Sequence, residues 1–352
     1  MEQVLLILVV ALAFVLAFIN GFHDGFNVIA NSVLSRSMIP VKALLFACIA
    51  TFFAPLLFGT AVATTIGKEI INPAFFNRAA CIAPMLFIIS GLVSAIVWSL
   101  MTWWVGLPPS SSHALLGGLV GGGIAAFGFD IVNWSKLLFK ACLFLFMSPL
   151  AGVGLAFLVM RISASIYNHT RGTKKDFFKQ AQWFSLICLS AGHGTNNAQK
   201  AMGIITMVLV VAGSIQAFEV PPWAVLGCAL ALTLGVSAGG WKLLRILGDR
   251  SFRIKPIHAF NAQFTGGVIF LFAGLIGSPI STTQIVKSTI IGVGAGYRKR
   301  TVRMMLIKDI MMAWLITIPA AAFLSATIYW TVSGALGHGM GSFESIMKLF
   351  GQ

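Results

Sequence analysis

The sequence has few charged residues for its length. Only 9% of its 352 residues are Asp, Glu, Lys or Arg, whereas 58% are hydrophobic. About a quarter of the residues in a soluble globular domain are charged, so this composition excludes a soluble protein. At about 20 apolar residues per crossing, the chain could form roughly ten segments in a lipid bilayer. Little chain is left for a catalytic domain outside the membrane.

Acidic residues are scarcest, with nine Asp and Glu against 24 Lys and Arg, a net charge of +15. A basic excess is typical of nucleic-acid-binding proteins, but the positions argue against a nucleic-acid partner. Sixteen basic residues form four clusters between apolar stretches, as in the cytoplasmic loops of membrane proteins. The clusters are Arg36 and Lys42; Arg161, Arg171, Lys174, Lys175 and Lys179; Lys242, Arg245, Arg250, Arg253 and Lys255; and Arg298, Lys299, Arg300 and Arg303.

The sequence also lacks the patterns of disulfide and metal sites. The cysteines are odd in number and lie within apolar runs, which is typical of small core residues. No two histidines have the H-x-x-x-H spacing of a zinc site, so we expect no bound metal and no cofactor. The cysteines are Cys48, Cys81, Cys142, Cys188 and Cys228.

Polar residues between 161 and 181 divide the chain near its middle. We predict a first transmembrane repeat over 1–160, a cytoplasmic basic linker over 161–181 and a second repeat over 182–352. If every basic cluster is cytoplasmic and each stretch crosses once, both termini lie outside and the second half is inverted, as in many secondary transporters. The apolar stretches are 3–34, 42–66, 79–105, 108–128 and 137–160, then 183–213, 222–246, 257–277, 279–296 and 303–331.

Two polar motifs recur at nearly the same offset. Residues 21–27 (GFHDGFN) align with 194–200 (GTNNAQK) at an offset of 173, and 108–113 (PPSSSH) align with 279–284 (PISTTQ) at an offset of 171. The fold class we predict is therefore an all-α polytopic membrane protein with two inverted-topology repeats of about five segments each. The first stretch is too long for one straight crossing, so we expect it to be broken or tilted. The expected break lies at Asn20-Gly21, with its counterpart at Gly192-His193-Gly194.

The two hydroxyl runs indicate half-helices that begin inside the membrane. Proline followed by Ser or Thr is typical of a helix start, and free N–H groups there can bind a tetrahedral oxyanion. The alternative is that these hydroxyls bond to their own helix backbone. The predicted substrate-binding hydroxyls are Ser110, Ser111, Ser112, Ser281, Thr282 and Thr283.

Asp24 is the only acid well inside the apolar stretches of the first half. A carboxylate at bilayer depth is costly and indicates function, either as a cation ligand or as a proton acceptor, although it could also be a structural partner of His23 or Asn27. The equivalent position, Asn197, offers only a neutral carbonyl. Lys200 can neutralise a bound anion, or simply extend toward the membrane surface.

The four motifs together resemble the inorganic phosphate transporter (PiT) family, and bacterial low-affinity members most closely. The resemblance covers nearly the whole chain. It implies a cation-coupled symporter that binds phosphate or a metal-phosphate complex between the hydroxyl runs, with Lys200 beside them. The coupling-ion residues it implies are Asp24, Asn27, Asn196 and Asn197, with His23, His113 and Gln284 nearby.

Two departures from the family pattern concern the coupling ion. The family's second aspartate is Asn197 here, and its second hairpin histidine is Gln284. One fixed charge and one titratable ring are therefore missing, which leaves the number of coupling ions open. Because Asp24 and several histidines remain, we favour a proton over sodium. Phosphate is favoured over sulfate because only phosphate can donate a proton to Asp24.

Other functions fit parts of the sequence. A permease for sulfate or another tetrahedral oxyanion, or an uncoupled anion channel, would use the same hydroxyls. An intramembrane hydrolase is disfavoured because Ser112 and His113 are adjacent on one helix and do not face each other; we therefore expect no enzyme. The resemblance places the chain in the bacterial cytoplasmic (inner) membrane, and the sequence is compatible with a homodimer.

Overall fold

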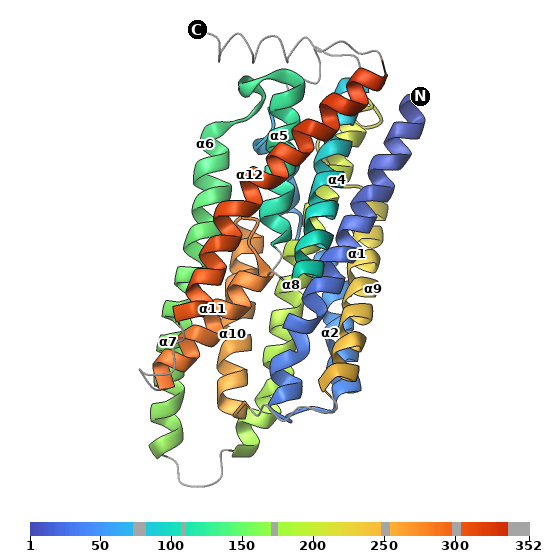
Figure 1. Ribbon diagram of the computed structural model, residues 1–352. Helices are drawn as coiled ribbons and strands as arrows, with labels where there is room; N and C mark the ends of the chain where they lie inside the picture. The colour runs from blue at the N-terminus through green and yellow to red at the C-terminus, as the bar shows by residue number, and fades with distance from the viewer. Residues whose placement is uncertain (73–81, 107–109, 170–174, 248–253, 298–303, 337–352) are drawn as a thin grey trace.

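A computed structural model describes residues 1–72, 82–106, 110–169, 175–247, 254–297 and 304–336, and these residues form a bundle of helices without a β-sheet. The predicted all-α class is confirmed (Figure 1). The helices are α1 (Glu2–Leu34), α2 (Pro40–Leu57), α3 (Ala61–Thr64), α4 (Ile82–Val105), α5 (Ser111–Phe127), α6 (Trp134–Lys136), α7 (Leu143–His169), α8 (Lys175–Val211), α9 (Pro222–Leu247), α10 (Pro256–Leu275), α11 (Thr282–Tyr297) and α12 (Met304–Ala335).

The protein is a multi-pass membrane protein by the length and hydropathy of these helices. Within the described residues, six helical segments are long and apolar enough to cross a bilayer. Helix α8 is not among them, because its middle turns carry a run of polar residues from 193 to 200. Proline at the first position starts α2, α9 and α10, where its missing N–H has no helical partner to lose.

Helices α10 and α11 form a hairpin that enters and leaves the bundle at one end. Lys255, which precedes α10, donates a 2.8 Å hydrogen bond to the hydroxyl of Tyr297, the last residue of α11. Helices α4 and α5 form a second hairpin, in which Phe127 at the end of α5 packs against Phe87 near the start of α4. The two hydroxyl runs, at the starts of α5 and α11, are therefore carried by two helical hairpins. That each of these four apolar stretches crosses the bilayer once stays a prediction.

Helices α1 and α8 are continuous, so the expected breaks at Asn20-Gly21 and Gly192-His193-Gly194 are wrong. The glycines serve close helix packing instead. A Cβ atom on Gly21 would lie 2.1 Å from the carbonyl oxygen of Leu232 on α9, and one on Gly194 would lie 2.5 Å from that of Thr51 on α2. Small residues that let backbones approach are a common packing device between membrane helices.

The predicted linker is mostly helical, because α7 continues to His169 and α8 begins at Lys175. Helix α7 ends and α8 begins at the lower end in Figure 1, whereas α1 begins and α12 ends at the upper end. Residues 170–174 lie outside the described residues. So do Pro108 and Pro109 of the first hydroxyl run, Cys81, and the basic residues at 171, 174, 250, 253, 298–300 and 303.

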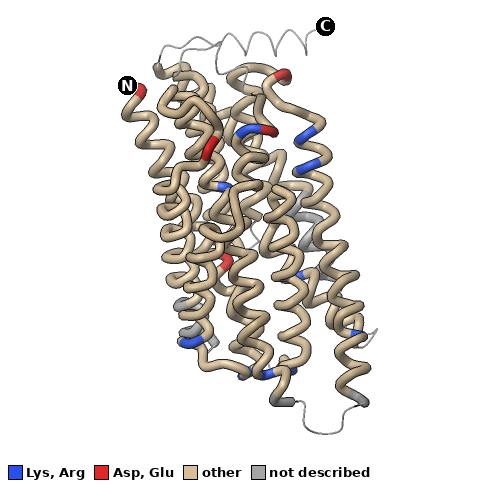
Figure 2. The backbone as a smooth tube through the Cα atoms, turned by 180° about the vertical axis from the view of Figure 1, so that it is seen from behind, with Lys and Arg blue, Asp and Glu red and all other residues tan. Residues whose placement is uncertain are grey.

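Lys and Arg gather at the lower end of the bundle, where α1 and α7 end and α2, α8 and α10 begin (Figure 2). The upper end carries charges of both signs, including an ion pair of 2.7 Å between Lys140 and Glu69. The two ends of the described bundle therefore differ in charge. The four described cysteines, Cys48, Cys142, Cys188 and Cys228, are free thiols.

Replacing Gly21 by Ala should destabilise the bundle, because the added methyl group overlaps the α9 backbone at Leu232. We expect a loss of about 1–3 kcal/mol, the usual cost of overpacking. Gly154→Ala on α7 is the matched control, since a Cβ atom there meets nothing within 4 Å. A thiol-reactive dye that reports exposure of the buried Cys228 on heating measures both. Equal unfolding midpoints for the two variants would contradict the packing role.

Candidate functional site

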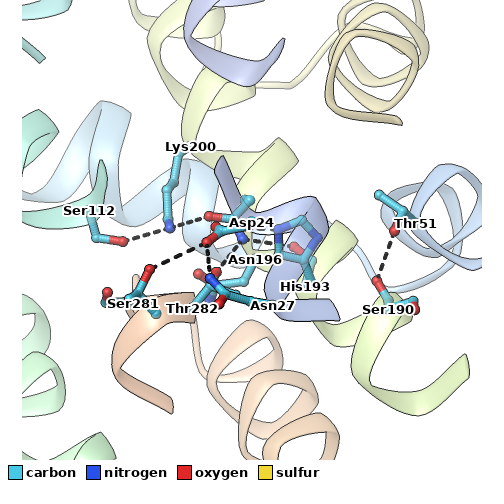
Figure 3. A network of polar contacts seen from close by, with 12 residues as sticks. Asp24, Asn27, Thr51, Ser112, Ser190, His193, Asn196, Lys200, Ser281 and Thr282 are labelled. Atoms are coloured by element: carbon cyan, nitrogen blue, oxygen red, sulfur yellow. Dashed lines mark hydrogen bonds and ion pairs between the residues drawn. The ribbon is translucent and has the colours of Figure 1, made fainter. Parts of the chain in front are cut away.

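The starts of α5 and α11 meet in the middle of the bundle, between α1 and α8 (Figure 3). Ser110 and Ser281 immediately precede the two helices, and the Ser110 hydroxyl donates a 3.1 Å hydrogen bond to that of Ser281. The Ser110 side chain does not cap its own helix. Two clusters of hydroxyl groups from distant parts of the chain therefore face each other, as the recurrent motif predicts.

Lys200 fixes both helix starts to α8. Its ammonium is fully buried and donates hydrogen bonds to Ser112 Oγ at 2.6 Å, Asn197 Oδ1 at 2.7 Å and the carbonyl of Ile280 at 3.1 Å. Ser112 in turn donates to the same Ile280 carbonyl at 2.7 Å. All three ammonium donors thus have protein acceptors.

The Asp24 carboxylate of α1 also lies at these helix starts (Figure 3). It accepts hydrogen bonds from Asn27 at 3.1 Å and Thr283 at 3.4 Å, and His193 Nε2 lies 3.5 Å from its second oxygen. The side chain is only 5% exposed. Asp24 therefore links α1, α8 and α11, and it offers carboxylate oxygens to a cation or a proton.

Asn196 and Asn197 hold the segment before α11. The Asn196 amide donates to the Ser278 carbonyl at 3.0 Å and accepts from the Ile280 N–H at 3.3 Å. The Asn197 amide donates to Thr282 Oγ1 at 2.9 Å. The polar atoms of both asparagines are therefore engaged with protein groups in this structure.

A small pocket lies between Asp24 and the two hydroxyl runs, with a volume of about 10 Å³, close to that needed for one water molecule. Four of the predicted substrate-binding residues and two of the predicted coupling-ion residues line it. The other predicted site residues do not line it. The lining residues are Asn20, His23, Asp24, Ser111, Ser281, Thr282 and Thr283.

Asn20 lines the pocket but is not among the site residues that the sequence predicts. Its side chain is 2% exposed, and its Oδ1 atom has no hydrogen-bond partner among the described residues. It lies one helical turn before Asp24, on the same face of α1. The sequence contains a signal for it, because a polar amide one helical turn before an acid in an apolar stretch indicates a shared polar site. The sequence prediction uses Asn20 only as the point of a helix break.

The predicted histidines have different environments. His23 lines the pocket and stacks on Trp103, with 5.9 Å between ring centroids, whereas His113 shares a short hydrogen bond with Ser110 through Nδ1. Gln284 occupies the corresponding position on α11, yet neither atom of its buried amide has a hydrogen-bond partner in the described part of the chain. Those residues also contain no group of three His, Cys, Asp or Glu side chains arranged to hold a metal.

This arrangement can bind an oxyanion. Several hydroxyls can donate to it, two helix N-termini point their N–H groups toward the centre, and the Lys200 ammonium supplies positive charge. Asp24 can compensate by taking up a cation or a proton. A multi-pass bundle with such a site at mid-depth defines a class, the membrane transport proteins for small anions.

Comparison with known proteins gives the family. The chain belongs to the Phosphate transporter family, which matches residues 20–175 and 163–325. It is 38% identical to a probable low-affinity inorganic phosphate transporter of Bacillus subtilis over 94% of this chain and 98% of that protein. It is 41% identical to a protein of the same description in Rhizobium meliloti, over 86% and 89% of the two chains. The family and these relatives are transporters and not enzymes.

A solved structure shares the fold. It is described as the sodium-dependent phosphate transporter, and it superposes with a TM-score of 0.82 over 94% of this chain and 99% of that one, at 24% sequence identity. The predicted resemblance is thereby confirmed at the level of family and fold.

Replacing Gln284 by Met should leave the stability unchanged or raise it, because removing an unpaired buried amide removes a desolvation cost. Gln263→Met is the matched control. The Gln263 amide accepts hydrogen bonds from Ser32 and Ser185 and donates to the Val28 carbonyl, so its loss should cost about 2 kcal/mol or more. Thermal unfolding of the two variants in the same detergent measures the difference. A larger loss for Gln284→Met would show that its amide has partners in the folded protein.

Proposed function

We propose that this protein is a symporter that couples uptake of inorganic phosphate to entry of a cation. The observation that carries the proposal is the meeting of two hydroxyl-bearing helix starts beside a buried carboxylate and a buried ammonium. The family and the relatives support phosphate as the substrate. Within this site, Ser111, Ser281, Thr282 and Thr283 would donate to the phosphate oxygens, and Lys200 would attract the anion through its charge.

Phosphate binding requires the two helix starts to separate. The pocket has room for about one water molecule, which is much less than a phosphate ion needs. Breaking the hydrogen bond from Ser110 to Ser281 would release both hydroxyls. A phosphate oxygen could then replace Ser281 as the acceptor for the Ser110 hydroxyl. Closure around the bound anion, with opening toward one membrane face at a time, is the alternating-access mechanism that we propose.

An inverted-repeat arrangement of the two halves would suit this mechanism. The α4–α5 hairpin carries one hydroxyl run and the α10–α11 hairpin carries the other, and the hairpins approach the centre from opposite ends of the bundle (Figure 1). An arrangement related by a pseudo-two-fold axis allows one half to open as the other closes. The rigid unit that moves in each half would contain the hairpin.

The coupling cation would bind at Asp24 with Asn27. We favour a proton, since His193 and His23 lie beside this carboxylate and Asn197 gives the second half no matching acid. Sodium is the rival ion, because the solved structural neighbour is described as sodium-dependent. The basic lower end would face the cytoplasm by the positive-inside rule, which would place both termini outside a bacterial inner membrane.

Uptake of labelled phosphate into proteoliposomes tests the coupling. We expect accumulation under an inward proton gradient that exceeds uptake under an inward sodium gradient and resists excess unlabelled sulfate. Asp24→Asn should abolish the accumulation, because the carboxylate that takes up the cation is lost. Uptake that only equilibrates under both gradients would identify a channel, and inhibition by sulfate would change the substrate.

The oxyanion site has its own test. Ser111→Ala and Thr282→Ala should each raise the phosphate concentration for half-maximal uptake by about tenfold, as expected for one lost hydrogen bond to a charged group. Thr327→Ala is the control, because that exposed hydroxyl bonds to its own helix at the Phe323 carbonyl. If both site variants transport with the affinity of the control, phosphate does not bind between these helix starts.

A further inference from the structure

A second, larger cavity lies at the basic end of the bundle. Its volume is about 850 Å³, and four cationic side chains line it, with no Asp or Glu among its described lining residues. The cations come from four different segments: Arg36 follows α1, Arg161 lies in α7, Lys179 in the first turns of α8, and Lys255 precedes α10. Because these side chains all carry positive charge and face one cavity, they produce a strong positive electrostatic potential inside it.

Aromatic groups hold some of these cations in place. The Lys255 ammonium lies 4.9 Å from the ring centroid of Tyr297 and donates to its hydroxyl, and the Arg161 guanidinium lies 5.6 Å from the ring centroid of Phe157. Each interaction is of the cation–π type. Because the partners are neutral, the positive charges remain available to a ligand in the cavity.

The cavity is separate from the central site. A buried hydrogen-bonded cluster lies between them, in which Ser32 donates to both Gln182 and Gln263 at 3.0 Å. Along α1, α8 and α10, these three residues stand between the residues of the central site and those that line the cavity. No residue lines both spaces. A ligand in the cavity therefore makes contacts that the central site does not.

We propose that this cavity is a second binding site, specific for a phosphate group. Like charges that face one cavity repel each other, and a dianionic or monoanionic phosphate relieves this repulsion. Guanidinium and ammonium groups together supply bidentate and point-charge donors to phosphate oxygens. Apolar walls formed by Met160, Phe178 and Ile257 can also accommodate hydrocarbon. The phosphate group can thus belong to inorganic phosphate or to the headgroup of an anionic phospholipid.

Equilibrium binding tests the site without a gradient, so its result does not depend on the transport proposal. The full chain in nanodiscs of phosphatidylcholine is titrated with labelled inorganic phosphate. The wild type should show a binding class that Arg161→Gln/Lys255→Gln weakens by at least about tenfold, since each lost charged hydrogen bond is worth at least that factor. Ser111→Ala/Thr282→Ala should leave this class intact and affect only the central site.

A charge-matched control separates a built site from a general effect of charge. Lys42→Gln/Lys136→Gln also removes two positive charges, from exposed positions outside the cavity, and should not change this binding. If the Arg161→Gln/Lys255→Gln variant does not fold, the exposed Lys179→Gln variant is measured in its place. A salt series from low to physiological ionic strength should weaken the binding of the wild type.

A lipid arm identifies the source of the phosphate group. The same proteins in nanodiscs that contain phosphatidylglycerol are examined by native mass spectrometry for retained lipid. If the headgroup is the ligand, the wild type and the Lys42→Gln/Lys136→Gln control retain phosphatidylglycerol that the cavity variant loses. If free phosphate is the ligand, only the titration separates the variants. Cavity and control variants that behave alike in both arms would overturn the proposal.

Discussion

The geometry of the centre depends on one buried ammonium. Lys200 is fully enclosed, and its three donors go to Ser112 of α5, to Asn197 of its own helix and to the carbonyl of Ile280 before α11. A buried charge without partners would cost several kcal/mol, so each of these contacts is strongly favoured. Because the acceptors come from three segments, the Lys200 ammonium can make all three hydrogen bonds only when both hairpin tips lie against α8. The two hydroxyl runs and the N-termini of α5 and α11 therefore face each other.

The helices around this centre are held by close backbone contact. Within lipid, association gains little from the hydrophobic effect and depends on packing. Helices α1 and α9 illustrate this reciprocally, since Gly21 and Gly25 of α1 face the backbone of α9 while Gly235 and Gly239 of α9 face the backbone of α1. The polar residues of α1 are thereby held at a fixed depth. Asn20 and Asp24 can then share one pocket with the start of α11.

Much of this structure could be predicted from the sequence, because composition fixes the membrane class and the recurrence of two motifs identifies the residues that meet. The continuity of α1 and α8 could not be predicted from the sequence. Glycine permits both an unwound turn and a close contact, and only the position of the Leu232 and Thr51 carbonyls decides between them. The hydrogen bond from Lys200 to the Ile280 carbonyl could not be predicted either, because a pattern of side chains does not indicate where a backbone carbonyl lies.

The difference between Asp24 and Asn197 changes the charge of the centre. In the family pattern an aspartate occupies the second position, where its charge would neutralise an ammonium one turn away. Here the Asn197 amide accepts from Lys200 at 2.7 Å but carries no charge, so the positive charge of Lys200 is not cancelled by its own helix. In the mechanism that we propose, an anion entering between Ser111 and Thr282 would therefore be attracted by Lys200 without competition from a carboxylate on α8. Asp24 of α1 would then be the carboxylate that takes up the coupling cation.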